Sequence, residues 1–431
     1  MWFLLQSALA APSIPFEKFE LENGLDVILA PDSSIPFVQV NVWYHVGSRN
    51  EVAGRTGFAH LFEHLMFQGS ANAPGEYFAP LQKIGAQING TTNIDRTNYF
   101  EGIPSHQLPL ALFMESDRMG FLLPALDETK LLNQKDVVRN ERRQHYENRP
   151  YGMAWPWLLE SVYPDGHPYH TATIGRHQDI EAATLEDVKA FFQTWYLPNN
   201  ASLVVSGDFE PRVVRPLVKE WFGDLPRGPA PPKQEFKVAK LKKDVMVRKE
   251  SDVPFEKVWI AWHTPAVLRP GDAELDLISR VLSDGKDSRL YRRLVRELQI
   301  AQDVEAYQTS SYLQSMFIIE STAQPGHTAA ELVTAIDDVL ADMRKNPATA
   351  AELAVARTSF EVAFFDNIAT IAGKANLLNN YNFLTGDPGY LEADLARYQL
   401  ASPGNVRAAF KKYLGRPRVV LEIVPAKAGA Q

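Results

Sequence analysis

Residues 58–67 of this sequence read Phe58-Ala59-His60-Leu61-Phe62-Glu63-His64-Leu65-Met66-Phe67. The apolar residues recur at the spacing of an amphipathic helix, and the pair Gly69-Ser70 follows where such a helix would end. We therefore expect a helix whose apolar face is packed in a core. His60 and His64 are four residues apart, so both imidazoles would project from one side of that helix.

This pair of histidines has the spacing of a metal site. Side chains four residues apart on a helix have Cβ atoms roughly 5–6 Å apart, so two imidazole nitrogens can meet one zinc ion at about 2.0–2.1 Å. Glu63 lies on the same face, where its carboxylate could accept a proton from water in the open position of the zinc ion. Two surface histidines on an ordinary amphipathic helix are the alternative interpretation.

A catalytic zinc ion needs a third protein ligand, and the sequence has no cysteine to provide it. That ligand must therefore be a histidine or a carboxylate. A predicted helix over residues 131–146, with the residue that follows it, offers Asp136, Glu141, His145 and Glu147. Spacing alone does not choose among these four, and all of them would also suit a solvated helix surface.

Composition limits the class of protein. A chain of 431 residues is long enough for two or three domains, since single cores stop growing near roughly 250–300 residues. A hydrophobic fraction of 45% and a charged fraction of 22% are ordinary for a soluble globular protein. The net charge of −8 argues against a nucleic-acid partner, because phosphate binding needs a basic surface.

The first twelve residues are mostly apolar and contain Ala8-Leu9-Ala10, which resembles the end of a secretory signal cleaved after Ala10. The basic start of such a signal is missing, so an apolar N-terminal strand or arm is the alternative. We expect residues 1–12 to be a signal-peptide remnant of a periplasmic or otherwise exported protein, with a cytoplasmic location as the alternative. The run is shorter than the ~20 residues that span a bilayer, so we expect no membrane insertion.

Residues 225–232 contain four prolines and a glycine, which predicts an extended linker. We expect residues 225–245 to join two domains, 13–224 and 246–431. Each side has an alternating strand followed by an amphipathic helix, and each ends with a helix and then a strand. This pattern predicts an α+β fold of two homologous domains, each a mainly antiparallel sheet with helices packed on one face.

The metal motif occurs in only one of these halves. Aligning the predicted helix at 273–283 with the motif helix places Asp276, Ser279 and Arg280 opposite His60, Glu63 and His64, respectively. We therefore expect one zinc ion per chain, bound by residues of 13–224. The second half would serve as a scaffold or as a wall for the substrate.

The sequence resembles the pitrilysin/insulinase family of metallopeptidases, in particular the short-chain branch that includes mitochondrial processing peptidase. The strongest match is residues 56–70. Other matches follow in order along nearly the whole chain: residues 21–27, 47–51, 167–169, 174–175, 196–201 and 207–209. The resemblance implies a zinc peptidase that cleaves unfolded peptides or oligopeptides, with Glu63 as the general base.

The resemblance also makes the choice that spacing leaves open, because the family's third zinc ligand corresponds to Glu141. The family often has another glutamate two helical turns earlier, where this chain has Gln134. That departure leaves the ligand set intact but affects the residues that orient the ligands. His145, one turn beyond Glu141, is a candidate to compensate.

Residues 87–93 resemble the family's edge strand, which pairs with the extended backbone of the substrate. Asn89, Gly90 and Thr91 lie in this segment, and main-chain pairing of this kind tolerates many substrate sequences. An interior hairpin that ends in a polar loop is the alternative.

One departure from the family pattern concerns catalysis. Active members combine the zinc site with an arginine and a tyrosine from a distant domain, and this chain has Val295 and Gln302 at those positions. Arg296 lies one residue later, but nothing replaces the tyrosine. The resemblance therefore implies a heterodimer in which a homologous partner subunit supplies the arginine–tyrosine pair. A non-catalytic structural subunit and a metal-binding module are the alternatives, and the intact Glu63 disfavours both.

Overall fold

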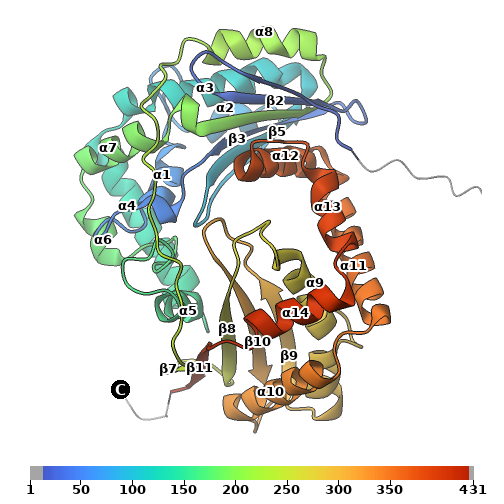
Figure 1. The fold of residues 1–431 in the computed structure, drawn as a ribbon. Coiled ribbons are helices and arrows are strands. Elements are labelled where there is room, and N and C mark those ends of the chain that lie inside the picture. The colour runs from blue at the N-terminus through green and yellow to red at the C-terminus, as the bar shows by residue number, and fades with distance from the viewer. Residues whose placement is uncertain (1–12, 427–431) are drawn as a thin grey trace, which may run out of the picture.

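The computed structural model describes residues 13–426, so the expected signal at residues 1–12 lies outside the described residues. Within the described range the strands form two sheets, which Figure 1 shows one above the other. The first sheet contains β1 (Glu17–Glu20), β2 (Asp26–Pro31), β3 (Phe37–Tyr44), β4 (Gln87–Thr92), β5 (Thr97–Pro104) and β6 (Ala201–Gly207). The second contains β7 (Val245–Ser251), β8 (Lys257–Thr264), β9 (Ala301–Gln308), β10 (Ser315–Ala323) and β11 (Val419–Pro425).

The two sheets have the same topology. The strand order is β1-β2-β6-β3-β5-β4 in the first sheet and β7-β11-β8-β10-β9 in the second, so the second repeats the first from β2 onward. In each sheet one neighbouring pair is parallel, β2 with β6 and β7 with β11, and the other pairs are antiparallel. The predicted α+β class, with two homologous and mainly antiparallel sheets, is confirmed.

Helices of the first half are α1 (Phe58–Leu65), α2 (Phe78–Gln82), α3 (Leu108–Ala125), α4 (Glu128–Arg142), α5 (Ala154–Val162), α6 (His177–Ala182), α7 (Leu185–Trp195) and α8 (Pro211–Phe222). Those of the second half are α9 (Asp272–Ser283), α10 (Ala329–Lys345), α11 (Ala350–Ile368), α12 (Ile371–Thr385), α13 (Leu391–Gln399) and α14 (Pro403–Tyr413). In the described part of the chain, none of them combines the length and apolarity needed to cross a membrane.

The helix expected over residues 131–146 differs at both ends. It begins three residues earlier, where the Asp127 carboxylate accepts a hydrogen bond of 2.8 Å from the Lys130 N–H and caps the first turn. It ends as an α-helix at Arg142, and residues Arg143–Glu147 continue as a π-helical turn. The change of hydrogen-bonding pattern thus begins two residues after Glu141.

Each half covers one face of the other half's sheet. Successive residues of a strand point to opposite faces, and on β2 Leu29 belongs to the main core whereas Ile28 packs with Ala375 and Leu378 of α12. Figure 1 shows α12 beneath the first sheet, although it belongs to the second half. In return, Leu158 of α5 shares a core with strands β8 and β11 of the second sheet. Each sheet is therefore covered on only one face by helices of its own half.

Residues 226–244 join the halves without a helix or strand and are fixed to both. Asn199 of the first half donates to the carbonyl groups of Gly228 and Pro229, at 3.2 and 3.0 Å. The backbone of Ala239 exchanges two hydrogen bonds with the side chain of Gln314, between β9 and β10. The domain limits 13–224, 225–245 and 246–431 remain our proposal.

Candidate metal centre

Helix α1 is anchored through its apolar face. Leu61, Phe62 and Leu65 are buried, and all three lie in the main core, on the face of the first sheet opposite to α12. The side of the helix that carries His60 and His64 faces away from that core toward α4, where both residues are half-buried. The amphipathic pattern of residues 58–67 thus orients both imidazoles toward one neighbouring helix.

The N-terminus of α1 is fixed by two features. Gly57 has a φ of 87°, a left-handed conformation that favours glycine, and a Cβ there would lie 2.9 Å from the carbonyl oxygen of Ile174. The Glu51 carboxylate accepts hydrogen bonds from the N–H groups of Gly57 and Ala59, both at 2.9 Å. These hydrogen bonds satisfy backbone donors that have no partner within the helix. Burial raises the pKa of Glu51 to about 8, and the hydrogen bonds from the backbone oppose that shift.

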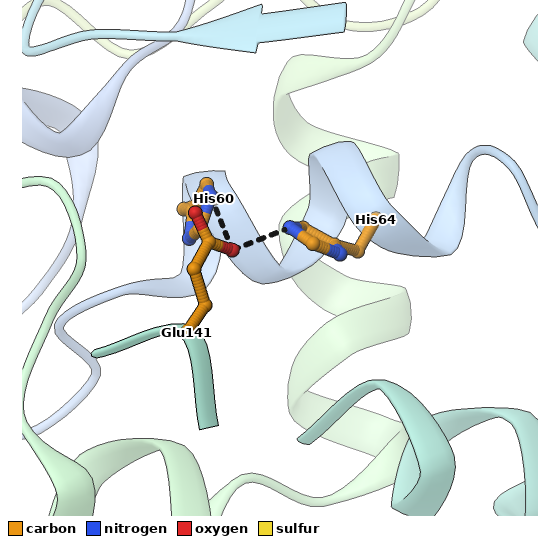
Figure 2. A group of neighbouring side chains, drawn as sticks. All are labelled: His60, His64 and Glu141. Atoms are coloured by element: carbon orange, nitrogen blue, oxygen red, sulfur yellow. Dashed lines mark ion pairs between the residues drawn. The ribbon is translucent and has the colours of Figure 1, made fainter. Parts of the chain in front are cut away.

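Two helices bring His60, His64 and Glu141 together, as Figure 2 shows. One ligand atom from each residue lies within 4.8 Å of the other two. Glu141 Oε2 is 3.7 Å from His60 Nε2 and 3.3 Å from His64 Nε2. Ligand atoms about 2.0–2.1 Å from one tetrahedral ion lie roughly 3.4 Å apart, so these separations fit a shared zinc ion.

The protonation of these groups also fits a metal. Burial, together with the neighbouring His64 ring, lowers the pKa of His60 to about 4, so this imidazole is neutral at neutral pH. The contact with His64 lowers the pKa of Glu141 below its usual range, which keeps the carboxylate ionised. Neutral imidazole and ionised carboxylate are the forms that bind a metal. As a ligand set, two histidines and one carboxylate suit zinc.

Glu63 lies between the two histidines in sequence and is half-buried. Burial raises the pKa of its carboxyl group above the usual range, while the charges of His64 and Arg96 oppose that shift. A carboxylate with a raised pKa is a better proton acceptor than an exposed one. Glu63 therefore has the properties of a general base next to the three converging residues.

The other candidates on α4 and the turn after it make different contacts. His145 lies 3.5 Å through Nδ1 from Glu141 Oε1, the oxygen that the two motif histidines do not face. Glu147 instead pairs with Arg142 at 3.0 Å and with His177 at 2.9 Å. The carboxyl group of Asp136 is exposed and lies 3.8 Å from Arg139. Gln134 is buried in α4, two turns before Glu141.

The strand that resembles a substrate-pairing edge does lie at an edge of the first sheet. β4 is the last strand and pairs only with β5 on its inner side. Asn89 is exposed, and its side-chain oxygen accepts a hydrogen bond of 2.9 Å from the Gly90 N–H. A Cβ at Gly90 would lie 3.0 Å from the ring of Phe67, so glycine allows β4 to pack closely against the end of α1. Thr91 is the next residue along this edge.

The second half has no comparable donor set at the matching place in α9. There the half-buried Asp276 side chain accepts a hydrogen bond of 2.6 Å from the Tyr398 hydroxyl. Val295 packs against the second core, and Gln302 donates to the carbonyl of Ala323 at 2.7 Å. Arg296 forms an exposed ion pair of 2.9 Å with Asp287. Among residues 13–426, one group of histidine and carboxylate side chains has the geometry of a metal site.

Sequence reasoning gave no role to Glu51, although the segment 47–51 matched the family pattern. The only local signal was an acidic residue shortly before a predicted helix start, which is common in many proteins. The contact of Glu51 with the start of α1 depends on the conformation of the loop between β3 and α1, which local sequence patterns do not specify.

Comparisons with known proteins agree with this geometry. A family profile described as "Insulinase (Peptidase family M16)" matches residues 26–165, and one described as "Peptidase M16 inactive domain" matches residues 182–360. The chain is 32% identical over 377 residues to "Zinc protease PqqE" of Helicobacter pylori, across 85% of this chain and 83% of that protein. This chain belongs to peptidase family M16. The resemblance to the pitrilysin/insulinase family is thus confirmed.

Solved structures share the M16 fold described above. A protease from Helicobacter pylori superposes with a TM-score of 0.90 at 28% identity, over 96% of this chain and all of that one. The periplasmic protease PqqL from Escherichia coli has a TM-score of 0.78 at 16% identity, with 97% of this M16 chain aligned to 49% of that protein. The two-sheet unit of this chain therefore occurs both as a separate chain and as part of a longer one.

Proposed function

We propose that this M16 chain is the zinc-bearing subunit of a metallopeptidase that hydrolyses peptide bonds in unfolded peptides or oligopeptides. The observation that carries the proposal is the convergence of His60, His64 and Glu141 next to Glu63. The first three would hold one zinc ion per chain. When bound, zinc supplies Lewis acidity and lowers the pKa of water toward about 7.

Glu63 would handle the proton in this reaction. Its carboxylate would accept a proton from the water that attacks the peptide carbonyl carbon, and would then give that proton to the leaving amine nitrogen as the C–N bond breaks. The outer edge of β4, at Asn89, Gly90 and Thr91, would pair with the extended substrate backbone. A substrate strand there would compete with the Asn89 side chain for the Gly90 N–H.

A partner subunit would complete the site. Val295 and Gln302 stand where active relatives carry arginine and tyrosine, and both are engaged within the second half. A homologous subunit with that arginine–tyrosine pair would form a heterodimer with this chain. The alternative is a non-catalytic structural or assembly subunit, for which Glu63 would have no chemical use.

The decisive test replaces Glu63 with glutamine. Glu63→Gln should keep about one zinc ion per chain but lower peptide hydrolysis by about 10²–10⁴-fold, because an amide cannot accept the proton. Glu128→Gln, an exposed change on α4, is the matched control and should keep full activity. The assay uses this chain with its homologous partner. Turnover that is equal in Glu63→Gln and the control would favour the structural subunit.

We also propose that the protein is exported to the periplasm or beyond. The support is the Ala-x-Ala pattern at residues 8–10, together with the fact that PqqL from Escherichia coli is a periplasmic protease. N-terminal sequencing of the protein from fractionated cells tests this. A mature chain that starts at Ala11 supports export, and an uncleaved chain in the cytoplasm contradicts it.

A further inference from the structure

The turn between β4 and β5, residues 93–96, directly follows the proposed substrate strand and contacts the second half. Asp95 in this turn is buried at 8% exposure. Its Oδ2 accepts a hydrogen bond of 2.9 Å from the backbone N–H of Tyr312, which lies between β9 and β10 in the second half. One acidic side chain of the first half thus binds the backbone of the second.

The hydroxyl group of Tyr169 forms the other part of this contact. It donates to Asp95 Oδ1 at 2.6 Å and accepts from the N–H of Leu313 at 2.8 Å. Two successive backbone donors of the second half, at 312 and 313, are therefore paired with first-half oxygens. Buried backbone donors need such partners, so the contact is costly to lose.

Arg49 adds a charge to the same contact. Its guanidinium lies 3.6 Å from Asp95 Oδ1 and 4.3 Å from the centre of the Tyr312 ring. Arg49 also holds the turn itself, because its backbone N–H donates to the carbonyl of Ile94 at 3.0 Å. The carboxylate thus has partners on each of its oxygens, and they come from both halves.

The position of Asp95 is transmitted to β4 by side chains within the turn. The Asn93 side-chain oxygen accepts the N–H groups of Asp95 and Arg96, at 2.7 and 2.8 Å, which makes the turn rigid. The Arg96 guanidinium donates back to the carbonyl of Thr91 at 2.9 Å and also contacts the Thr91 hydroxyl. A shift of Asp95 would therefore move Thr91 at the end of the edge strand.

We propose that Asp95 is a positioning residue, through which the metal-free second half fixes the edge strand β4 for the substrate. The inference rests on the proposed use of β4 in substrate pairing. This contact would give the second half a defined role in substrate binding. That role does not require a metal ligand or an acid–base group in the second half. Because the contact involves a turn rather than the zinc-site residues, it should affect substrate binding and leave the metal in place.

Asp95→Asn is the variant that tests this role. An amide has an acceptor oxygen in only one of the two carboxylate positions, so it cannot accept from both the Tyr169 hydroxyl and the Tyr312 N–H, and it removes the charge beside Arg49. The matched control is Asp32→Asn. Asp32 follows β2 and forms an ion pair with Lys374 of α12, so the control also removes a carboxylate contact between the halves, but far from β4 in the sheet order.

Hydrogen exchange measured by mass spectrometry gives a readout independent of activity. In Asp95→Asn, residues 87–96 should exchange about tenfold faster than in the parent chain, since one buried donor loses its partner. Asp32→Asn should leave exchange in this segment unchanged. Tyr169→Phe removes one hydroxyl only and should give a similar effect if Asp95→Asn folds poorly. Unchanged exchange in both Asp95→Asn and Tyr169→Phe, or an equal increase in the control, would overturn the proposal.

Peptide binding separates this proposal from the proposed function. In a Glu63→Gln background, fluorescently labelled β-casein, an unfolded polypeptide, should bind about tenfold more weakly after Asp95→Asn and equally well after Asp32→Asn. With the partner subunit present, KM should rise by the same factor and zinc content should stay within about twofold. The value of kcat should fall by a smaller factor than KM rises, because Arg96 of the same turn also acts on Glu63. Faster exchange at β4 without any β-casein binding to the Glu63→Gln parent would refute the use of β4 in substrate pairing and leave the positioning contact intact. Equal binding by Asp95→Asn and its parent would refute the positioning role alone.

Discussion

His64 is the more accessible of the two motif histidines, with its side chain 23% exposed against 12% for His60. His60 is kept neutral by burial, which lowers its pKa to about 4. The Glu141 oxygen, in contrast, lies closer to His64 than to His60. The two histidines thus differ in how they would contribute: one is pre-organised by the core, and the other by the carboxylate.

Removal of one of the three proposed zinc-ligand side chains should abolish metal binding at the site in the first half. We expect His64→Ala to reduce zinc from about one ion per chain to a small fraction, because two protein ligands do not hold a catalytic zinc ion. Metal analysis of the purified protein measures this. His106→Ala, at an exposed position outside the site, should keep full occupancy. Full occupancy in His64→Ala would remove this histidine from the ligand set.

At the residue scale, spacing alone identified the two histidines and Glu63, because four-residue separation on a helix has a direct geometric meaning. It could not identify the third partner, since one predicted helix and the residue after it offer four candidates: Asp136, Glu141, His145 and Glu147. The family resemblance selected Glu141. The structure brings Glu141 to both histidines, and places His145 against its other oxygen.

At the element scale, the position of α1 depends on Glu51. We expect Glu51→Gln to lower the free energy of unfolding by about 1–2 kcal/mol, since the amide has one acceptor for the two N–H groups of Gly57 and Ala59. Urea unfolding of the metal-free protein measures this. Glu128→Gln, in the exposed first turn of α4, should cost no more than about 0.5 kcal/mol. An equal loss in the two variants would show that Glu51 has no special role at α1.

The sequence predicted the existence of α4 but not its change to a π-helical turn at Arg143–Glu147. Side-chain periodicity differs little between the two kinds of helix over five residues, so the pattern has no clear signal for the change. The edge position of β4 also could not be predicted from the periodicity of its side chains, because an edge strand and an interior strand can share one alternating pattern. Only the order of strands in the sheet decides which of them has a free side.

At the scale of the whole molecule, buried histidines at the contact between the halves should make the fold sensitive to acid. His167 of the first half stacks on Tyr163 at 4.6 Å, and the ring of His263 of β8 lies 5.5 Å from the same tyrosine. Burial lowers the pKa of each histidine to about 4. Between pH 6.5 and 4 the unfolded chain binds protons that the folded chain does not, so stability should fall as pH falls.

At pH 5 each of these histidines should cost roughly 2 kcal/mol relative to pH 7, and both are less than a tenth exposed. Urea unfolding of the metal-free protein at the two pH values measures the loss. In His263→Gln the loss should be smaller by about that amount, whereas the exposed control His106→Gln should retain all of it. An unchanged pH dependence in His263→Gln would place the acid-sensitive groups elsewhere.

The duplicated sheets could be predicted from repeated strand and helix patterns, but the exchange of covering helices could not. Nothing in the sequence of α12 or α5 marks it as the cover of the other half's sheet, because any amphipathic or apolar helix could pack on its own half. The contacts of Asp95 with Tyr312 and Tyr169 share this property. They join residues far apart in the chain, so local patterns have no information about them.

The last prediction concerns the assembled enzyme. The lone chain should hydrolyse peptides about 10²–10³-fold more slowly than the chain with a homologous partner that carries the arginine–tyrosine pair, because a preformed stabiliser of the transition state is missing. A homodimer would not help, since Val295 and Gln302 recur in each copy and Arg296 is paired with Asp287. The measurement compares the lone chain, the chain with its partner, and the chain with a partner whose arginine and tyrosine are replaced by alanine and phenylalanine. The third sample should be as slow as the first, because docking alone does not restore the missing groups. Full activity of the lone chain would mean that its own residues complete the site, and the division of labour between two subunits would be wrong.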